Sequence, residues 1–310
     1  FDLMVCGQLR GACRLANGGS DGVPAIRGNY GTGVLLACLG LEQDIFPDKM
    51  PWLKRHLTPA EAARLSVDDI RVQGAFERGL EFMRHHRSLF GDRLPMYCMD
   101  TQGPFDLAHL LLGDEIFLLL HDDEGLLHHV LEICLELGIR AHTLMKEISG
   151  EAMDECHHNG GIYIDAGAGI RICEDATAIV GPDGINTFAI PYSRRLAAHF
   201  GGGWVHYCGR NDHLTDAVCA APELKGINFG HMPAGKQAHD FEADMRRCHE
   251  SGTVYFGHWW REPEESGADF LKRLHRWASA GCLLAMADAA VGEDGGFGST
   301  REALEFWYAL

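Results

Sequence analysis

The sequence predicts an α/β protein folded as an eight-stranded (β/α)8 TIM barrel, and three observations lead to this fold class. Short apolar runs typical of buried strands alternate along the chain with longer amphipathic stretches typical of helices. Polar residues gather directly after the apolar runs, where the loops of a barrel carry its chemistry. A length of 310 residues and a hydrophobic content of 46% suffice for one large barrel with its own core.

Seven segments are predicted as strands, and the eighth strand of the barrel is not distinguishable in the sequence. Each predicted strand is a short run rich in β-branched, aromatic and other apolar residues. In chain order they cover residues 23–30, 95–99, 161–164, 204–207, 226–229, 253–256 and 282–285.

The stretches between these strands predict helices, with residues 1–20 as a cap segment attached to the barrel. Ser66, followed by Asp68 and Asp69, indicates a helix start within the first long stretch, because these side chains accept hydrogen bonds from free backbone N–H groups. Since no long linker or repeat interrupts the pattern, we interpret residues 1–310 as a single domain. The predicted helices cover residues 59–87, 124–148, 182–200, 238–250 and 267–280.

Composition excludes several classes of protein. A net charge of −17, from 27 basic and 44 acidic residues, argues against nucleic acid as a partner. The apolar stretch 110–120 is interrupted by polar residues and is too short to span a membrane, and we find no signal peptide. The 11 scattered cysteines are typical of reduced thiols, so we expect a cytoplasmic protein. The sequence leaves open whether the chain forms a homodimer.

The segment His206-Tyr207-Cys208-Gly209 indicates a metal site. On a strand, His206 and Cys208 face the same side, so both side chains can reach one ion. Cys282, at the start of another predicted strand, would add a third ligand at the rim of a closed barrel. An imidazole and two thiolates suit Zn²⁺ and leave a fourth position open for a substrate. The alternative is that all three are ordinary buried residues.

Further polar and aromatic residues follow the predicted strands and are candidates for the same site. Each has a structural alternative: Asp100 and Asp165 could cap helices, Arg27 could pair with one of them, and Trp259 could belong to the core. The candidates for catalysis are Asp100, Gln102, Asp165 and His258, and those for substrate binding are Arg27, Asn29, Tyr30, His231 and Trp259.

With these residues in place, the chain resembles the uroporphyrinogen decarboxylase-like superfamily, and within it the zinc-dependent, corrinoid-linked branch that includes the coenzyme M methyltransferases. The resemblance covers most of the chain, from about residue 21 to residue 282. In these enzymes a His-x-Cys and a distant Cys bind zinc, and Cys282, 74 positions after Cys208, fits that spacing. The other stretches that carry the resemblance are TQGPFDLA at 101–108, EDA at 174–176 and PYSRRL at 191–196.

The resemblance implies methyl transfer that depends on Zn²⁺ and a corrinoid, with methylcobalamin carried by a partner protein. A thiol that enters the open zinc position would lose its proton and become a nucleophile, or the zinc would activate a small methylated substrate. The acidic surface would then face the corrinoid carrier protein. One departure from the family pattern is the segment 226–232, which has no carboxylate, so His231 or water would provide a fourth ligand.

Two alternatives share the fold. A metal-free tetrapyrrole decarboxylase needs arginines that clamp many carboxylates, and the stretch 10–14 (RGACR) is a poor substitute for the arginine-bearing motif of that family. A barrel that binds a corrinoid or a small ligand without turnover has no need of two thiolates at an open rim.

Overall fold

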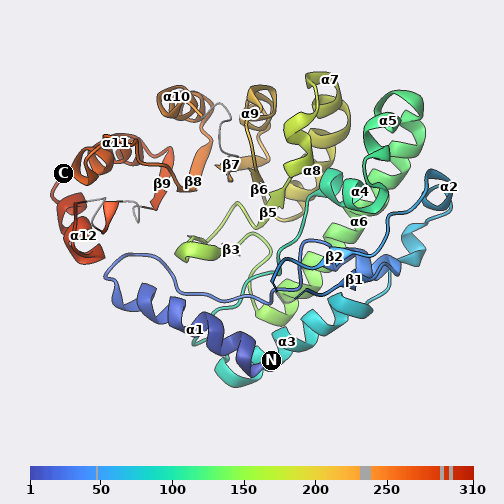
Figure 1. The fold of residues 1–310 in the computed structure, drawn as a ribbon, viewed down its shortest axis with the longest axis horizontal. Coiled ribbons are helices and arrows are strands. Elements are labelled where there is room, and N and C mark those ends of the chain that lie inside the picture. The colour runs from blue at the N-terminus through green and yellow to red at the C-terminus, as the bar shows by residue number, and fades with distance from the viewer. Residues whose placement is uncertain (47, 231–238, 287–289, 293–295) are drawn as a thin grey trace.

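The structure is a computed structural model of the chain that describes residues 1–46, 48–230, 239–286, 290–292 and 296–310. Its centre is a parallel sheet of five strands in chain order, β5-β6-β7-β8-β9. Figure 1 shows these strands along an arc, with helices α8 to α11 on its outer side. The strands are β5 (Ile170–Cys173), β6 (Gly203–Tyr207), β7 (Leu224–Phe229), β8 (Val254–His258) and β9 (Leu283–Met286).

A helix connects each strand to the next, which is the arrangement that parallel strands require. The helices that return the chain between strands are α8 (Ile190–His199), α9 (Asp212–Cys219), α10 (Phe241–Ser251) and α11 (Gly267–Ser279). Because every crossover runs the same way, all carboxyl ends of the strands meet at one edge of the sheet.

The prediction of an α/β fold with parallel strands is confirmed, but the described residues do not form a closed ring of eight strands. Segments 23–30 and 95–99 meet only at a parallel bridge between Ile26 and Met96. Segment 161–164 belongs to an antiparallel hairpin, β3 (Cys156–His157) with β4 (Tyr163–Ile164). The strand of the central sheet in this part of the chain is β5, which the sequence analysis did not predict.

The helical predictions for 124–148, 238–250 and 267–280 are confirmed within a few residues by α6 (Glu124–Ser149), α10 and α11. The helix expected over 59–87 is divided, because Ser66 caps a new turn: its Oγ accepts from the Asp68 N–H at 3.1 Å. That stretch contains α2 (Pro59–Ala62), η2 (Val67–Asp69) and α3 (Gly74–Phe90).

The helix expected over 182–200 is realised as α7 (Pro182–Gly184), a π-helical turn, η5 (Ile185–Ala189), and α8. The cap segment forms α1 (Asp2–Asn17). The remaining helices are η1 (Val34–Leu39), α4 (Pro104–Leu112), α5 (Glu115–Asp122), η3 (Asn159–Gly161), η4 (Asp175–Ile179) and α12 (Thr300–Tyr308), and the remaining strands are β1 (Gln43–Asp44) and β2 (Trp52–Leu53). In the part of the chain that the structure describes, no helix combines the length and apolar character needed to cross a membrane.

A small apolar cluster of Ile162, Trp204 and Phe256 packs on the inner face of the sheet. Ile162 comes from the hairpin region, so the β3–β4 hairpin lies against the inner face. Trp204 is 1% exposed, and its ring meets Phe256 edge to face with centroids 5.4 Å apart. Burial of such a pair stabilises the fold by about 2–3 kcal/mol per side chain.

Two buried carboxyl groups join α4 to the end of β5. Glu174 accepts from the N–H of Asp106 at 3.1 Å and from the hydroxyl of Ser193 at 2.6 Å. Asp106 in turn accepts from the N–H groups of Asp175 and Ala176, at 2.8 and 2.7 Å. Glu174 therefore accepts a free N–H group in the first turn of α4, and Asp106 accepts free N–H groups in the first turn after β5. The first turn of a helix favours an acidic partner of this kind.

Burial is the main physical cause of unusual ionisation in this pair. It raises the pKa of Glu174 to about 8, and burial together with Glu174 raises the pKa of Asp106 well above its usual range. Both pKa values are shifted upward, so burial makes each carboxyl group harder to ionise than an exposed one.

Gly103 leaves no room for a side chain beside Glu174. A Cβ atom there would lie 2.3 Å from Glu174 Oε1 and 2.7 Å from a methyl carbon of Ile172. Because Glu174 is fixed by its hydrogen bonds, we expect Gly103→Ala to lower the free energy of unfolding by about 1–3 kcal/mol, measured by urea denaturation. Gly11→Ala in α1, where nothing lies within 4 Å, is the control and should be neutral or stabilising. Equal stability of the two variants would contradict this account.

Candidate functional site

His206 stands at the carboxyl end of β6, and Asn228 on the neighbouring β7 fixes its ring. The two residues are register partners, and His206 Nδ1 lies 2.6 Å from Asn228 Oδ1. The amide nitrogen of Asn228 donates to the Phe256 carbonyl, so its oxygen is the atom that faces His206. Since an amide oxygen only accepts, His206 carries its proton on Nδ1, and Nε2 keeps a free lone pair for a metal.

Three further donor groups lie around His206 Nε2. Cys208 Sγ is 3.7 Å from it, and Asp175 Oδ1 is 4.0 Å from it. The N–H of Cys208 donates to the same Asp175 oxygen at 2.6 Å, which ties the loop after β6 to the start of η4. Ligand atoms of Cys173, Asp175 and His206 all lie within 4.8 Å of one another. Cys173, Asp175 and His206 form the compact part of the candidate metal centre, and Cys208 joins it through the contact of its sulfur with His206.

Gly230 provides the space in front of this centre. It follows β7, and its N–H donates to the Tyr207 carbonyl at 2.8 Å. A Cβ atom at this position would lie 2.4 Å from Cys208 Sγ and 2.9 Å from His206 Nε2. Any larger residue would therefore occupy the volume between the two donor atoms.

A row of charged side chains lies beside the candidate centre on the inner face of the sheet. Asp100 binds two guanidinium groups, Arg27 at 3.1 Å and Arg171 at 2.9 Å. Burial opposes ionisation of Asp100, but Arg171 and Arg27 outweigh it and hold the pKa of Asp100 below its usual value. Burial and the nearby Arg171 also lower the pKa of His206, which keeps its imidazole neutral. A neutral imidazole is the form that binds metals.

A cavity of about 450 Å³ opens next to the candidate centre. Asn228 borders both, because its side chain bonds His206 and also lines the cavity. Among the described residues, the lining includes aromatic rings and imidazoles but no lysine, arginine or carboxylate. The lining residues are His158, Asn159, Ile162, Trp204, Asn228, Phe229, Gly230, Gly257, His258 and Trp260.

His239 supports the site from behind, and the sequence analysis did not identify it. Its Nε2 donates to the carbonyl of Gly209, the residue after Cys208, at 2.8 Å. Its Nδ1 lies 3.2 Å from Asp244 Oδ2 in α10. The ring stacks on Phe229 with centroids 3.7 Å apart and planes within 4°. His239 therefore links the turn after Cys208 to the aromatic wall of the cavity.

The structure does not bring Cys282 to His206 and Cys208. Cys282 lies immediately before β9, at the amino end of that strand, whereas His206 and Cys208 lie at the carboxyl end of β6. Its thiol is buried and donates to the Trp277 carbonyl of α11 at 3.4 Å. In the register of the sheet, Met286 pairs with His258 at the carboxyl edge. Residues 287–289, which follow β9, lie outside the described residues.

The other predicted catalytic residues are divided between the site and its surroundings. His258 ends β8 and lines the cavity, and Asp100 lies beside the centre as the partner of Arg27 and Arg171. Gln102 is buried just before α4. Asp165 is exposed in the segment that enters β5 at its amino end, away from the carboxyl edge of the sheet.

The predicted substrate-binding residues are also divided. Arg27 is held by Asp100, as one of the alternatives proposed. Asn29 is exposed, and the Tyr30 ring packs on Phe82 with centroids 6.5 Å apart. Trp259 is 2% exposed and belongs to the main core, while its neighbour Trp260 lines the cavity. His231 lies outside the described residues.

The residues that the sequence analysis missed lie mostly on β5 and directly after it. Cys173 and Arg171 belong to the strand, and Asp175 follows it. The signal that could have revealed them is the alternation Ile170-Arg171-Ile172-Cys173 after two glycines, Gly167 and Gly169.

The fold is similar to that of a solved structure, described as a methyltransferase from Methanosarcina mazei. The TM-score is 0.58 and the sequence identity is 14%, over 90% of this chain and 77% of the other chain. At this identity the similarity concerns the fold. No family model matches the sequence, and no curated protein matches it.

His142 lines a small cavity together with Arg27, Asp100 and Arg171, and it gives a pH-dependent contribution to stability. Its Nδ1 donates to the Gly138 carbonyl at 2.8 Å, and its Nε2 accepts from Thr101 Oγ1 at 2.7 Å. Complete burial lowers the pKa of His142 to about 4.

Because the folded pKa is depressed, the unfolded chain binds the extra proton between pH 4 and about 6.5. Stability from this group is present above pH 6.5 and is lost as the pH falls towards 4, by up to roughly 3 kcal/mol. We expect His142→Gln to remove this part of the acid-induced loss in the free energy of unfolding. Urea denaturation at several pH values measures it. His213→Gln, at an exposed histidine of α9, should leave the profile unchanged. An unaltered profile for His142→Gln would refute the assignment.

Proposed function

We propose that this chain is a zinc-dependent methyltransferase that moves a methyl group between a small methylated substrate or thiol and a corrinoid on a carrier protein. The proposal is supported chiefly by the convergence of His206, Cys208 and Asp175 at the carboxyl edge of the parallel sheet, next to a cavity. The similarity in fold to a methyltransferase supports the same reaction class.

The donor atoms of the candidate centre fit zinc. An imidazole nitrogen and a thiolate bound to one tetrahedral zinc are expected to lie about 3.5 Å apart. His206 Nε2 and Cys208 Sγ lie 3.7 Å apart without rearrangement. Asp175 and Cys173 supply an oxygen and a second sulfur, so three protein ligands can be completed without Cys282. We therefore propose His206, Cys208 and one of Asp175 and Cys173 as ligands, with a further position open to the substrate.

The chain's own residues would orient the ligands and receive the substrate. Asn228 sets the tautomer of His206, and Asp175 fixes the backbone of Cys208. His239 holds the turn that follows. When bound, zinc would lower the pKa of an incoming thiol or polarise a methyl donor. His258 lines the cavity, and we propose that it exchanges a proton with a bound substrate.

The lining of the cavity favours methyl transfer on a small ligand over the decarboxylation of a tetrapyrrole. A tetrapyrrole with many carboxylates requires cationic partners. The cavity lining has no lysine or arginine among the described residues, and Arg27 and Arg171 are both bound by Asp100. The aromatic walls suit a flat or apolar substrate carrying a methyl group.

Metal content tests the ligand assignment. We expect about one zinc per chain in the purified protein, measured by plasma mass spectrometry. Cys208→Ala and His206→Ala should remove most of it, because each deletes a ligand at a site that lies at the edge of the sheet. Cys282→Ala is the matched control and should keep the zinc, since its thiol lies at the opposite edge. Loss of zinc in Cys282→Ala, or its retention in Cys208→Ala, would overturn the assignment.

Turnover separates methyl transfer from simple ligand binding. With methylcobalamin and a panel of small thiols, we expect demethylation of the corrinoid, which its absorption spectrum reports. In the reverse direction, with reduced cobalamin and methoxylated aromatics or methylamines, we expect methylation of the corrinoid. Cys208→Ala should lower the rate by roughly 100-fold or more. Binding of these compounds without any change of the corrinoid would favour the binding protein, and full activity of Cys208→Ala would exclude a role for the metal.

A further inference from the structure

His158 is an imidazole on the inner face of the sheet to which the proposed function gives no role. It follows β3, and its backbone N–H donates to the Ile162 carbonyl at 2.8 Å. That hydrogen bond closes the turn of the β3–β4 hairpin. Gly160 and Gly161 in this turn have positive φ values of 77° and 84°, which favour glycine. The turn therefore fixes the backbone of His158.

Two aromatic rings hold the imidazole of His158. It meets the ring of Trp204 on β6 edge to face, with centroids 5.1 Å apart and planes at 76°. It meets the ring of Tyr97 in the same way, with centroids 5.5 Å apart and planes at 68°. Both partners are buried, and they come from distant parts of the chain. The imidazole thus has a defined orientation between two elements.

His158 is the one described residue that lines two cavities. One is the cavity of about 450 Å³ beside the candidate centre, which Trp204 also lines. The other is a small cavity of about 30 Å³, which Tyr97, Asp100 and Arg171 also line. Since Trp204 and Tyr97 both contact its ring, the imidazole of His158 lies at the boundary between the two cavities.

The imidazole of His158 has hydrogen-bonding capacity that the described part of the chain does not use. No group among the described residues makes a hydrogen bond with either ring nitrogen, and the ring contacts are the two aromatic ones. Burial is the main cause that lowers the pKa of His158 well below its usual value, and the charges of Arg171 and Arg27 add to it. The neutral ring has one nitrogen that donates a hydrogen bond and one that accepts.

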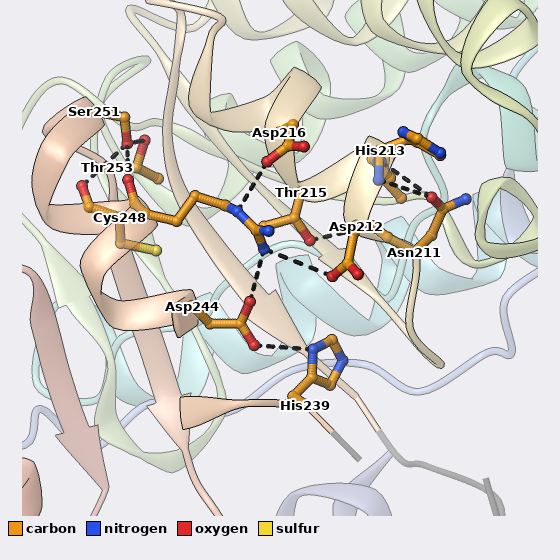
Figure 2. A network of polar contacts seen from close by, with 12 residues as sticks. Asn211, Asp212, His213, Thr215, Asp216, His239, Asp244, Cys248, Ser251 and Thr253 are labelled. Carbon is orange, nitrogen blue, oxygen red and sulfur yellow. Dashed lines mark hydrogen bonds and ion pairs between the residues drawn. The ribbon is translucent and has the colours of Figure 1, made fainter. Parts of the chain in front are cut away.

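A fixed aromatic wall belongs to the larger cavity. Phe229 and Trp260 both line it, and the ring of His239 lies parallel to each of them, with planes within 4° and 1°. Asp244 holds His239 in place, because its Oδ2 lies 3.2 Å from His239 Nδ1, as Figure 2 shows. A flat wall of this kind suits the face of an aromatic ring.

We propose that His158 is a substrate-binding residue, and that its imidazole makes a hydrogen bond to a polar substituent of an uncharged aromatic ligand in the cavity of about 450 Å³. A hydroxyl group fits this role, because it can both donate to and accept from an imidazole. The other polar residues of the described lining are Asn159, Asn228 and His258, and none carries a fixed charge. A charged ligand would therefore lose its hydration there without gaining an ion pair.

This inference rests on the proposed function in one respect, since it takes the cavity beside the candidate centre as the place where the substrate binds. It does not depend on zinc or a corrinoid, because the hydrogen bond and the aromatic wall are both provided by the chain itself.

Two ligands that differ by one hydroxyl group test the role of His158. Isothermal titration calorimetry of the full chain gives the dissociation constants of 4-methoxyphenol and methoxybenzene. We expect 4-methoxyphenol to bind roughly 2- to 10-fold more tightly, which is the contribution of one hydrogen bond. His158→Leu should abolish this preference, because the hydroxyl group then has no partner. His158→Gln keeps a donor and an acceptor and should retain part of the preference.

His275→Leu is the matched control. The imidazole of His275 also meets a tryptophan edge to face, Trp307 at 5.0 Å between centroids, but it belongs to α11 and does not line the cavity. This variant should keep the preference of the unaltered chain. A purely structural role of His158 would weaken the binding of both ligands equally. That result, an unchanged preference in His158→Leu, or no binding of either ligand to the unaltered chain would overturn the proposal.

The charge of the ligand gives a second readout that needs no variant. 4-Methoxybenzoate and 4-methoxybenzylamine are charged at pH 7 and should bind more weakly than 4-methoxyphenol. Tighter binding of either would refute an uncharged ligand. The results also separate this inference from the proposed reaction. Turnover without the predicted preference would refute the role of His158 alone, and the preference without turnover would refute methyl transfer and leave His158 as a ligand-binding residue.

Discussion

The reciprocal contact between Glu174 and Asp106 is the interaction on which the candidate metal centre depends. Buried carboxyl groups are costly unless they are hydrogen-bonded, and here each one accepts backbone N–H groups at the start of a helix. Asp106 positions the backbone of Asp175, and Asp175 positions the backbone of Cys208. The loop that carries Cys208, a proposed ligand, is thus held by Asp175, and Asp175 is held by the buried Asp106 of α4.

The inner face of the sheet differs in charge from the protein as a whole. The chain carries a net charge of −17, yet its cavity has neutral walls among the described residues. The two arginines nearest the candidate centre share one carboxylate, Asp100. Burial raises the pKa of the Cys173 thiol well above its usual value, and the nearby Arg171 opposes this shift without overcoming it. Acidic groups on the outer surface have little electrostatic effect at the centre, because the helical layer separates them from it and salt screens their charge.

The sequence could predict the elements whose signal is local and long. The helix at 124–148 and the strands at 204–207 and 226–229 follow from periodicity, and His206 with Cys208 follows from the alternation of a strand. The sequence analysis missed β5, because its alternating pattern covers only four residues, one of which is Arg171. Cys173 and Asp175 required knowledge of the register between β5 and β6. Cys282 was chosen for its spacing from Cys208, and this spacing does not show that the two cysteines share an edge of the sheet: Cys282 precedes β9 and lies at the amino end of that strand. Trp259 was a candidate for substrate binding, but it belongs to the core and its neighbour Trp260 lines the cavity, because the sequence does not say which of two adjacent residues faces inward.

Gly230 has a consequence for how related sequences should be interpreted. The ligand residues of the candidate centre can all be present in a chain that nevertheless has no room for an ion, because the position opposite them decides whether the volume is open. A homologue with alanine or serine at the position of Gly230 would pass any search for the His-x-Cys pattern while lacking the function that the pattern is taken to indicate. The absence of a side chain is here as informative as the presence of the two ligands, and it is a feature that a single nucleotide change can erase.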